Sequence, residues 1–325
     1  MTREPSVPAL KVAVLGAINW DTTAFERDFA APGEEVPVAR LEEFPGGKGA
    51  NTAVAAARIL GSGAVAFLGA LGNDQVKPSL LASLSSEGVR TDGVQVVEGA
   101  SSGRAFIVVD GSGAKTIHTH FGANDRYTPE HVRSPKSSAL LAGASAAVIM
   151  DVPLDASAAA AEIASSRSKV IFSPGVRASG PARALSGLLS VADDLVVDRS
   201  ELAKLSGRND PREGVEALHK KHAGVTIVAT LGPDGCLVAR DGKTTRVPPV
   251  RLAGLGLTAV NSTGSGDAFL AAYACYSLMG ASPEEAAGWG NLAGALNAAS
   301  AETRGSPTRA ALEEKMLLLR AKRRG

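Results

Sequence analysis

One stretch of the chain is Asn261-Ser262-Thr263-Gly264-Ser265-Gly266-Asp267-Ala268-Phe269, and it leads directly into the apolar run 270–279. Its glycines allow a turn whose backbone N–H groups point at one spot, and the helix behind it adds the positive end of its dipole. The stretch therefore predicts an anion site. Asp267 makes chemical sense there if it takes a proton from a hydroxyl that attacks a phosphoryl group. The alternative is an ordinary helix start with Thr263 or Ser265 as its N-cap.

Short apolar runs alternate with longer helical patterns along most of the chain. We predict buried strands over 11–17, 65–70, 146–150, 170–173, 195–197 and 225–230. We predict helices over 50–60, 77–86, 154–165, 199–205, 211–222, 267–279, 283–300 (with Ser282 as N-cap) and 307–322. This alternation indicates an α/β fold, with a mainly parallel central sheet flanked by helices on both faces.

Two segments break the alternation. Residues 20–45 are rich in charge and proline, and residues 94–121 have the pattern of hairpins. Strands without helices, inserted into an α/β chain, predict a small β-sheet that stands off the main domain as a lid. A length of 325 residues suits one such domain, so we expect a single domain over 1–325 with a lid from about 20–45 and 94–121.

Composition excludes several classes of function. The net charge of +1 offers no basic field for a nucleic acid, and 4% aromatic residues are too few for a base-stacking surface. Two distant cysteines give neither a disulfide framework nor a metal site. We find no signal-peptide pattern and no apolar run long enough for a membrane span, so we expect a cytoplasmic protein without nucleic-acid or membrane partners.

A second glycine-rich stretch, Pro45-Gly46-Gly47-Lys48-Gly49-Ala50-Asn51, precedes an amphipathic helix. It lacks the spacing of a Walker A motif. Glycines let a ligand approach the backbone closely, and Asn51 offers both a donor and an acceptor, which suits recognition of sugar hydroxyls. A tight strand–helix turn with a solvated lysine is the alternative.

Asn19 and Asp21 follow the first predicted strand. Ligands of open parallel sheets bind beyond the carboxyl ends of the strands, so both side chains are well placed for a polyol. Turn formation is the ordinary alternative for an Asn and an Asp at this place. The turn Thr230-Leu231-Gly232-Pro233-Asp234-Gly235 also follows a buried strand, and its position predicts contact with a nucleotide.

Taken together, these motifs resemble the ribokinase-like (phosphofructokinase-B) family of carbohydrate kinases, and within it most resemble ribokinases. Asn19 and Asp21, the stretch 46–51 and the stretch 263–267 agree with the family in order and spacing over nearly the whole chain. The resemblance implies a three-layer α/β sandwich with a β-lid. It also implies ATP and Mg²⁺ as cofactors, a small sugar or nucleoside as substrate, and a homodimer.

The resemblance also implies a role for each matching residue. Asp267 would be the general base, and the backbone of Gly264, Ser265 and Gly266 would complete the anion hole with it. The sugar pocket would be lined by Asn19, Asp21, Gly46, Gly47, Lys48 and Asn51. The nucleotide and its metal would lie near Asp198, Glu201, Thr230, Gly232, Gly235 and Asn291.

The chain departs from the family at three places. The family commonly has Asn where this chain has Asp198, which adds a negative charge near the metal and the phosphates. Ribokinases usually have Asp where this chain has Asn261, beside Thr263 at a monovalent-cation site, so K⁺ binding should be weaker. They also have a sugar-contacting Glu after a strand like 146–150, where Asp151 or Asp155 could serve with a shortened loop.

Phosphorylation of the primary hydroxyl of ribose, to ribose 5-phosphate, is the first hypothesis. A nucleoside kinase or a phosphosugar kinase of the same family is the second. A phosphosugar needs extra cations, and Lys48, Arg104, His118 and His120 are the candidates. A sugar- or nucleotide-binding regulator without catalysis is the third, and the intact Gly264-Ser265-Gly266-Asp267 turn argues against it.

Overall fold

The computed structural model describes residues 9–322 and contains two β-sheets. The large sheet has nine strands in the order β13-β12-β11-β10-β9-β8-β1-β4-β5. Its strands are β1 (Val12–Leu15), β4 (Val65–Gly72), β5 (Arg90–Val97), β8 (Ala146–Met150), β9 (Lys169–Ser173), β10 (Asp194–Asp198), β11 (Thr226–Thr230), β12 (Cys236–Arg240) and β13 (Lys243–Val247). All neighbours from β5 to β11 pair in parallel, whereas the β11–β12 and β12–β13 pairs are antiparallel, so that β12 alone among these nine strands runs in the opposite direction. The prediction of a mainly parallel sheet is confirmed.

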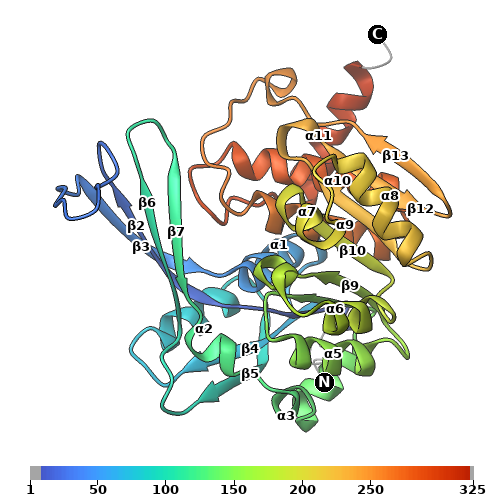
Figure 1. Ribbon diagram of the computed structural model, residues 1–325, viewed down its shortest axis with the longest axis horizontal. Coiled ribbons are helices and arrows are strands. Elements are labelled where there is room, and N and C mark those ends of the chain that lie inside the picture. The colour runs from blue at the N-terminus through green and yellow to red at the C-terminus, as the bar shows by residue number, and fades with distance from the viewer. Residues whose placement is uncertain (1–8, 323–325) are drawn as a thin grey trace, which may run out of the picture.

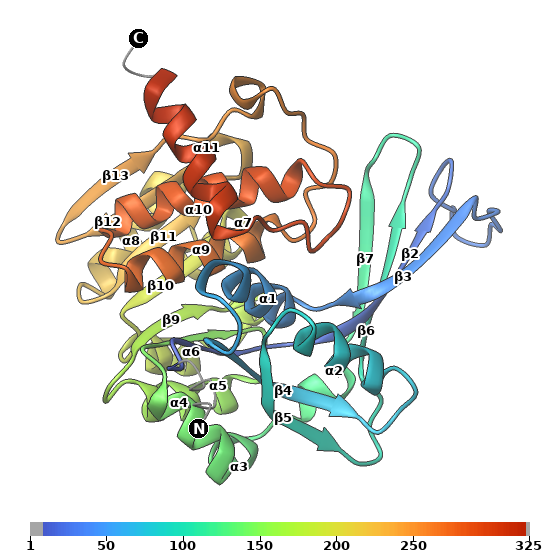
Figure 2. The ribbon, with the colours of Figure 1, turned by 180° about the vertical axis from the view of Figure 1, so that it is seen from behind.

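Helices cover both faces of this sheet (Figures 1 and 2). One apolar core joins the sheet to α1 (Lys48–Leu60), α2 (Lys77–Ser85), α9 (Ser265–Leu278), α10 (Pro283–Ala298) and α11 (Arg309–Lys322). The other core joins it to α3 (Pro129–Val132), α4 (Pro135–Gly143), α5 (Leu154–Ala164), α6 (Ala182–Leu189), α7 (Arg199–Ser206) and α8 (Pro211–Lys221).

The central strand β1 shows why its sequence forms a parallel strand. Val12 and Val14 pack into one core, and Ala13 and Leu15 pack into the other. A strand that is buried on both faces has to be apolar at every position, and β1 is apolar throughout. Crossover helices on both faces are the usual companions of such a sheet.

The small sheet stands away from the large one (Figure 2). Its order is β3-β2-β6-β7, with β2 (Asn19–Phe25), β3 (Arg40–Gly46), β6 (Gly103–Val109) and β7 (Lys115–His120). β2 and β3 pair antiparallel, as do β6 and β7, and β2 pairs with β6 in parallel. The small sheet therefore joins two segments that are far apart in the sequence.

One boundary of the predicted lid is wrong. We predicted residues 94–97 as part of the hairpins, whereas they end β5, which pairs in parallel with β4 at the edge of the large sheet. Residues 94–97 have the alternating pattern of any half-buried strand, and this pattern does not specify the sheet to which a strand belongs. The small sheet takes from this segment only β6 and β7.

Candidate active site

The turn before α9 places backbone donors where the sequence predicts an anion site. Gly264 is the N-cap of α9 and has φ +78°. A Cβ at this position would collide with the carbonyl of Thr303, so only glycine fits. No side chain caps the helix, which excludes Thr263 and Ser265 as the N-cap. Among residues 9–322, nothing accepts a hydrogen bond from the backbone N–H of Gly266 or Asp267.

Asp267 lies in the first turn of α9 and is 8% exposed. Its Oδ2 accepts a hydrogen bond of 2.9 Å from Nδ2 of Asn51, in the first turns of α1. No described residue donates to its Oδ1. Burial raises the pKa of Asp267 to about 6, although the hydrogen bond from Asn51 and the charge of Lys48 lower it. The carboxylate is thus buried, ionisable near neutral pH and open at one oxygen.

Asp21 on β2 is a second buried carboxylate of the site. Its Oδ1 is inaccessible to water and has no hydrogen-bond partner among the described residues. Burial raises the pKa of Asp21 to about 7, Arg304 lowers it and Asp267 raises it further. Gly46 lies directly against this carboxylate, which leaves no room for a side chain there.

Two more of the predicted sugar residues, Asn19 and Gly47, are fixed by contacts within the protein. Nδ2 of Asn124 donates to Oδ1 of Asn19 at 3.0 Å, so Asn19 is held in place by the segment after β7. Gly47 has φ +89°, and a Cβ there would collide with Ile18 and Asn19. The close approach of the 46–47 backbone to β2 therefore requires glycine at both positions.

Lys48 lies among carboxylates from several elements. Its Nζ is 3.6 Å from Oδ2 of Asp151. Burial lowers the pKa of Lys48, but the charges of Asp151, Glu201 and other carboxylates outweigh burial and raise it. Asp151 directly follows β8 and is buried, with φ +55°. Of the two candidates for the family's glutamate, Asp151 is the one that the structure brings into the site, because Asp155 lies in the first turn of α5.

Asp198 and Glu201 cap α7 reciprocally. Oδ1 of Asp198 accepts from the backbone N–H of Glu201 at 2.8 Å, and Oε2 of Glu201 accepts from the backbone N–H of Asp198 at 3.0 Å. Burial and the charge of Asp198 raise the pKa of Glu201 to about 7. Each carboxyl group therefore keeps one oxygen that the cap does not use.

The predicted nucleotide residues lie around the β11–β12 turn. Thr230 ends β11 and pairs with Asp198 across the sheet, and Gly232 and Gly235 have positive φ in the turn. Nδ2 of Asn291 on α10 donates to the carbonyl of Pro248 at 3.0 Å. These residues form a group of their own, and no hydrogen bond joins it to Asp267 within residues 9–322.

Asn261 and Thr263, the residues predicted for a monovalent cation, are hydrogen-bonded to neighbouring segments. Nδ2 of Asn261 donates to the carbonyl of Ala301 at 3.0 Å, and its Oδ1 accepts from the backbone N–H of Thr263. Nδ2 of Asn297 donates to the carbonyl of Thr263 at 2.8 Å. Two carbonyl oxygens of this region thus accept from side-chain amides, and position 261 itself brings an amide in place of a carboxylate.

One residue of this region was missed by sequence reasoning. Arg304, in the loop between α10 and α11, donates from Nε to Oδ1 of Asn51 at 2.8 Å. It belongs to no motif, and a single arginine after a helix is most often solvated, so no sequence signal pointed to it.

Comparison with known proteins agrees with this geometry. The model of the pfkB family of carbohydrate kinases matches residues 9–309, which is nearly the whole chain. The chain belongs to this family. A ribokinase of Haemophilus influenzae is 32% identical over 306 residues, which are 92% of this chain and 95% of that protein. The protein is therefore an ATP-dependent sugar kinase of the pfkB family, as the sequence predicted.

Solved structures show the same fold. A ribokinase from Thermotoga maritima superposes with a TM-score of 0.81 at 26% identity, over 95% of this chain and 99% of that one. A ribokinase from Arabidopsis thaliana, solved with ribose and ATP, superposes with a TM-score of 0.83 at 24% identity, over 96% of this chain and 99% of that one. The ribokinase-like fold is thereby confirmed. Within residues 9–322, no helix of this pfkB kinase is long and apolar enough to cross a bilayer.

Proposed function

We propose that this kinase transfers the γ-phosphoryl group of ATP to the primary hydroxyl of a pentose, with ribose as the favoured acceptor. The observation that carries the proposal is the buried Asp267, whose open oxygen lies in the same helical turn as two N–H groups without acceptors. A base and an anion site within one turn are what phosphoryl transfer to a hydroxyl requires.

In the proposed reaction, Oδ1 of Asp267 takes the proton of the acceptor hydroxyl. The hydroxyl oxygen forms a bond to the γ-phosphorus, the bond from that phosphorus to the β-phosphate oxygen breaks, and ADP leaves. The N–H groups of Gly266 and Asp267 stabilise the charge of the transferring group, as donors fixed before the reaction. Ser265 adds a hydroxyl that is buried and has no partner in residues 9–322.

The acceptor would bind beside Asp21 and Lys48. A buried carboxylate oxygen without a partner is costly unless a ligand donates to it, and the hydroxyl groups of a sugar are such donors. Asn19 and Asn51 offer further polar atoms. The backbone of Gly46 and Gly47 lies close against Asp21 and Asn19. Ribose is favoured because two of the similar proteins are ribokinases and a third was solved with ribose.

Asp198 and Glu201 fit a Mg²⁺ ion that is held mainly by phosphates. No group of three or more potential ligand side chains gathers within residues 9–322, so these residues alone offer no closed metal site. Mg²⁺ usually keeps waters and binds one or two carboxylates together with the phosphates of the substrate. The free oxygens of these two residues would hold it, and the pKa of Glu201 is raised first by burial and then by the charge of Asp198, which a cation would offset. When bound, Mg²⁺ neutralises charge on the β- and γ-phosphates.

The nucleotide would lie along the β11–β12 turn. Thr230 and Asn291 offer polar atoms there, and Gly232 has an exposed backbone, whereas Gly235 is buried against the carbonyl of Val247 and shapes the turn. The proposed reaction does not require K⁺, because position 261 supplies an amide in place of a charged carboxylate, and its Nδ2 donates to the carbonyl of Ala301.

The function is tested by ADP release with ATP and Mg²⁺ over a panel of acceptors: ribose, 2-deoxyribose, fructose, adenosine, cytidine and fructose 6-phosphate. We expect the highest kcat/KM with ribose. Turnover only with a nucleoside or with fructose 6-phosphate would overturn the pentose assignment. Bound ATP without turnover on any acceptor would favour a non-catalytic regulator.

We also propose a cytoplasmic homodimer that pairs through the outer face of the small sheet, which acts as a lid. Phe106 and Leu41 are 48% and 61% exposed on this sheet, and large apolar side chains in such positions suit a second copy. Light scattering of the purified protein gives its mass directly. We expect twice the chain mass for the natural protein and the mass of one chain for a Phe106→Glu variant.

A further inference from the structure

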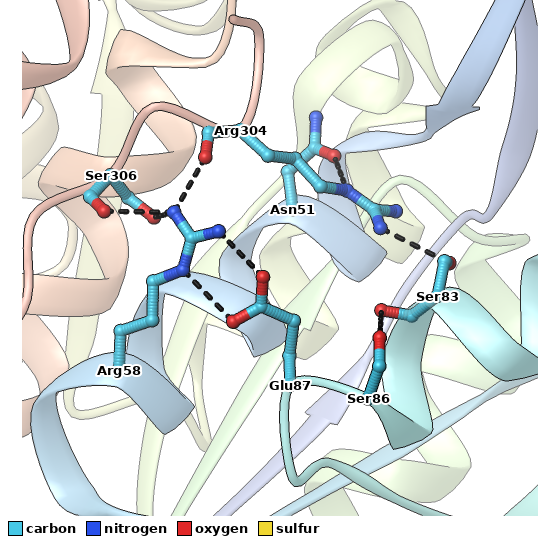
Figure 3. A network of polar contacts seen from close by, with 7 residues as sticks. All are labelled: Asn51, Arg58, Ser83, Ser86, Glu87, Arg304 and Ser306. Carbon is cyan, nitrogen blue, oxygen red and sulfur yellow. Dashed lines mark hydrogen bonds and ion pairs between the residues drawn. The ribbon is translucent and has the colours of Figure 1, made fainter.

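Arg304 reaches from the α10–α11 loop toward the candidate active site (Figure 3). Its Nε donates to Oδ1 of Asn51 at 2.8 Å, and its Nη1 donates to Oγ of Ser83 at 3.1 Å. Its Nη2 lies 3.4 Å from the carbonyl of Gly46. Burial lowers the pKa of Arg304 to about 10, so the guanidinium stays charged at neutral pH.

The contact with Arg304 leaves the Asn51 amide one orientation. Oδ1 faces a donor, the guanidinium, and Nδ2 faces an acceptor, Oδ2 of Asp267. Rotation of the amide by 180° would set its NH₂ group against the guanidinium and its oxygen against the carboxylate, and both contacts would be repulsive. Among residues 9–322, Oδ1 of Asn51 accepts from Arg304 alone, so without Arg304 only the contact with Asp267 would oppose that rotation.

Arg304 is itself held by a second arginine (Figure 3). Nη1 of Arg58 donates to the carbonyl of Arg304 at 2.5 Å and to that of Ser306 at 2.9 Å. The same guanidinium binds Glu87 through two parallel hydrogen bonds of 3.0 and 2.6 Å. A bidentate pair of this kind has a fixed geometry, so it anchors the backbone from which Arg304 extends.

We propose that Arg304 is a positioning residue for phosphoryl transfer, acting through Asn51 on Asp267. It fixes the amide so that Oδ2 of Asp267 is always occupied by a donor and Oδ1 is the oxygen presented to the acceptor hydroxyl. This inference rests on the proposed role of Asp267 as the base. Arg304 does not touch the substrate in this scheme, and its contribution is the geometry of the carboxylate.

The charges around Asp267 agree with this arrangement. The charged or polar side chains that face it are Lys48 and Asn51 of α1, Asp21 of β2, Asp151 after β8, and Arg304. Burial raises the pKa of Asp267, the hydrogen bond from Asn51 lowers it, and Arg304 lowers it as well. Loss of Arg304 removes its charge and loosens the Asn51 bond, so both changes raise the pKa of Asp267.

The test is a double-mutant cycle of Arg304→Gln and Asn51→Ala, measured as kcat against pH with the best acceptor. We expect Arg304→Gln alone to lower kcat by about 10- to 100-fold and to move the acid limb of the pH profile upward. In the Asn51→Ala background, the same change should cost less than about 3-fold, because the residue through which it acts is gone. Arg309→Gln is the matched control, since Arg309 pairs with Glu313 on the surface of α11, and it should match the natural protein.

The proposal would be overturned if the falls in kcat of Arg304→Gln and Asn51→Ala multiplied in the double variant and the acid limb of the pH profile did not move. Arg304 would then be a structural residue of its loop. If Arg304→Gln does not fold, Arg304→Lys takes its place in the cycle, because it keeps the charge, and the same non-additivity is expected. Asp267→Asn is assayed alongside. Full turnover by that variant would refute the proposed base itself, whereas its inactivity together with an additive cycle would refute only the role of Arg304.

Discussion

Two buried aspartates, Asp194 and Asp267, lie at the amino and the carboxyl ends of the strands of the large sheet, and they differ in their hydrogen-bond partners. Asp194 begins β10, is 2% exposed, and is bound by Nζ of Lys169 at 2.7 Å and by the hydroxyl of Tyr273 at 2.9 Å. Asp267 is 8% exposed and accepts one side-chain hydrogen bond, from Asn51. Tyr273 and Asp267 belong to the same helix, α9.

The two ends of the strands differ in how completely their buried carboxylates are paired. At the amino end of β10, the carboxylate has both a cation and a hydroxyl as partners, which offset part of its burial, although burial still raises its pKa. At the carboxyl ends of the strands, Asp21 and Asp267 each keep an oxygen without a partner in residues 9–322. Incomplete pairing of a buried group costs stability, and proteins retain it where a ligand completes the pairing.

Asp267→Asn should produce the largest change in function. The amide keeps the size of the side chain and accepts from Asn51, but it cannot take a proton, so we expect kcat to fall on the order of 10²–10⁴-fold. Steady-state ADP release measures the loss, and calorimetry with ATP checks that binding is retained. Turnover within a factor of two of the natural protein would remove Asp267 from the role of base.

Asp194→Asn should show the opposite profile. It leaves Lys169 without its carboxylate partner, but Lys169 is 28% exposed and burial already raises the pKa of Asp194, so the loss of the pair should cost only about 1 kcal/mol. We expect the free energy of unfolding, from urea denaturation, to drop by that amount while kcat at 20 °C stays within about 2-fold. A loss of kcat larger than the loss of folded protein would contradict the division between the two ends of the sheet.

The pH dependence sharpens the comparison further. Burial raises the pKa of Asp21 to about 7 and that of Asp267 to about 6. In the proposed reaction, Asp21 binds the sugar and Asp267 abstracts the proton as ionised carboxylates. We therefore expect kcat/KM for the sugar to fall as the pH drops below about 7, with a slope steeper than that of a single proton below 6. A profile that is flat from pH 8 to pH 5 would show that these carboxylates titrate like solvated ones.

The smallest expected effect is that of K⁺. Because Asn261 already donates to the carbonyl of Ala301, replacing KCl by choline chloride at equal ionic strength should change kcat by less than about 2-fold. Asn261→Asp replaces the donor by a charged acceptor, so this variant should gain thermal stability from KCl but not from choline chloride. Strong K⁺ activation of the natural protein would contradict the interpretation of the amide contacts.

The sequence predicted the α/β class because nearly every strand of the large sheet is apolar on both faces, a pattern that few other architectures share. It predicted Ser282 as a cap because Ser-Pro-x-Glu is a local signal, and the structure has that capping box. Asp198-Arg199-Ser200-Glu201 carries a similar local signal, and its capping box could have been predicted in the same way.

What the sequence left open depends on contacts between distant segments. β5 pairs with β4 because β4 offers the free edge of the large sheet, and the short strand pattern at 94–97 does not predict which sheet it joins. Arg304 meets Asn51 across 253 positions of the chain, and no spacing rule covers such a pair. Asp151 reaches the site through a backbone with φ +55°, which a residue type alone does not reveal.

The most direct test of the account is the thermal unfolding of Asp267→Asn without ligands at pH 7.5. The pKa of Asp267 is raised in the folded protein, so its ionised form opposes folding at this pH, and a neutral side chain of the same shape should relieve that cost. We predict a melting temperature equal to that of the natural protein or higher by about 2–4 °C. A melting temperature several degrees lower would show that the fold needs this carboxylate and would contradict its assignment to chemistry.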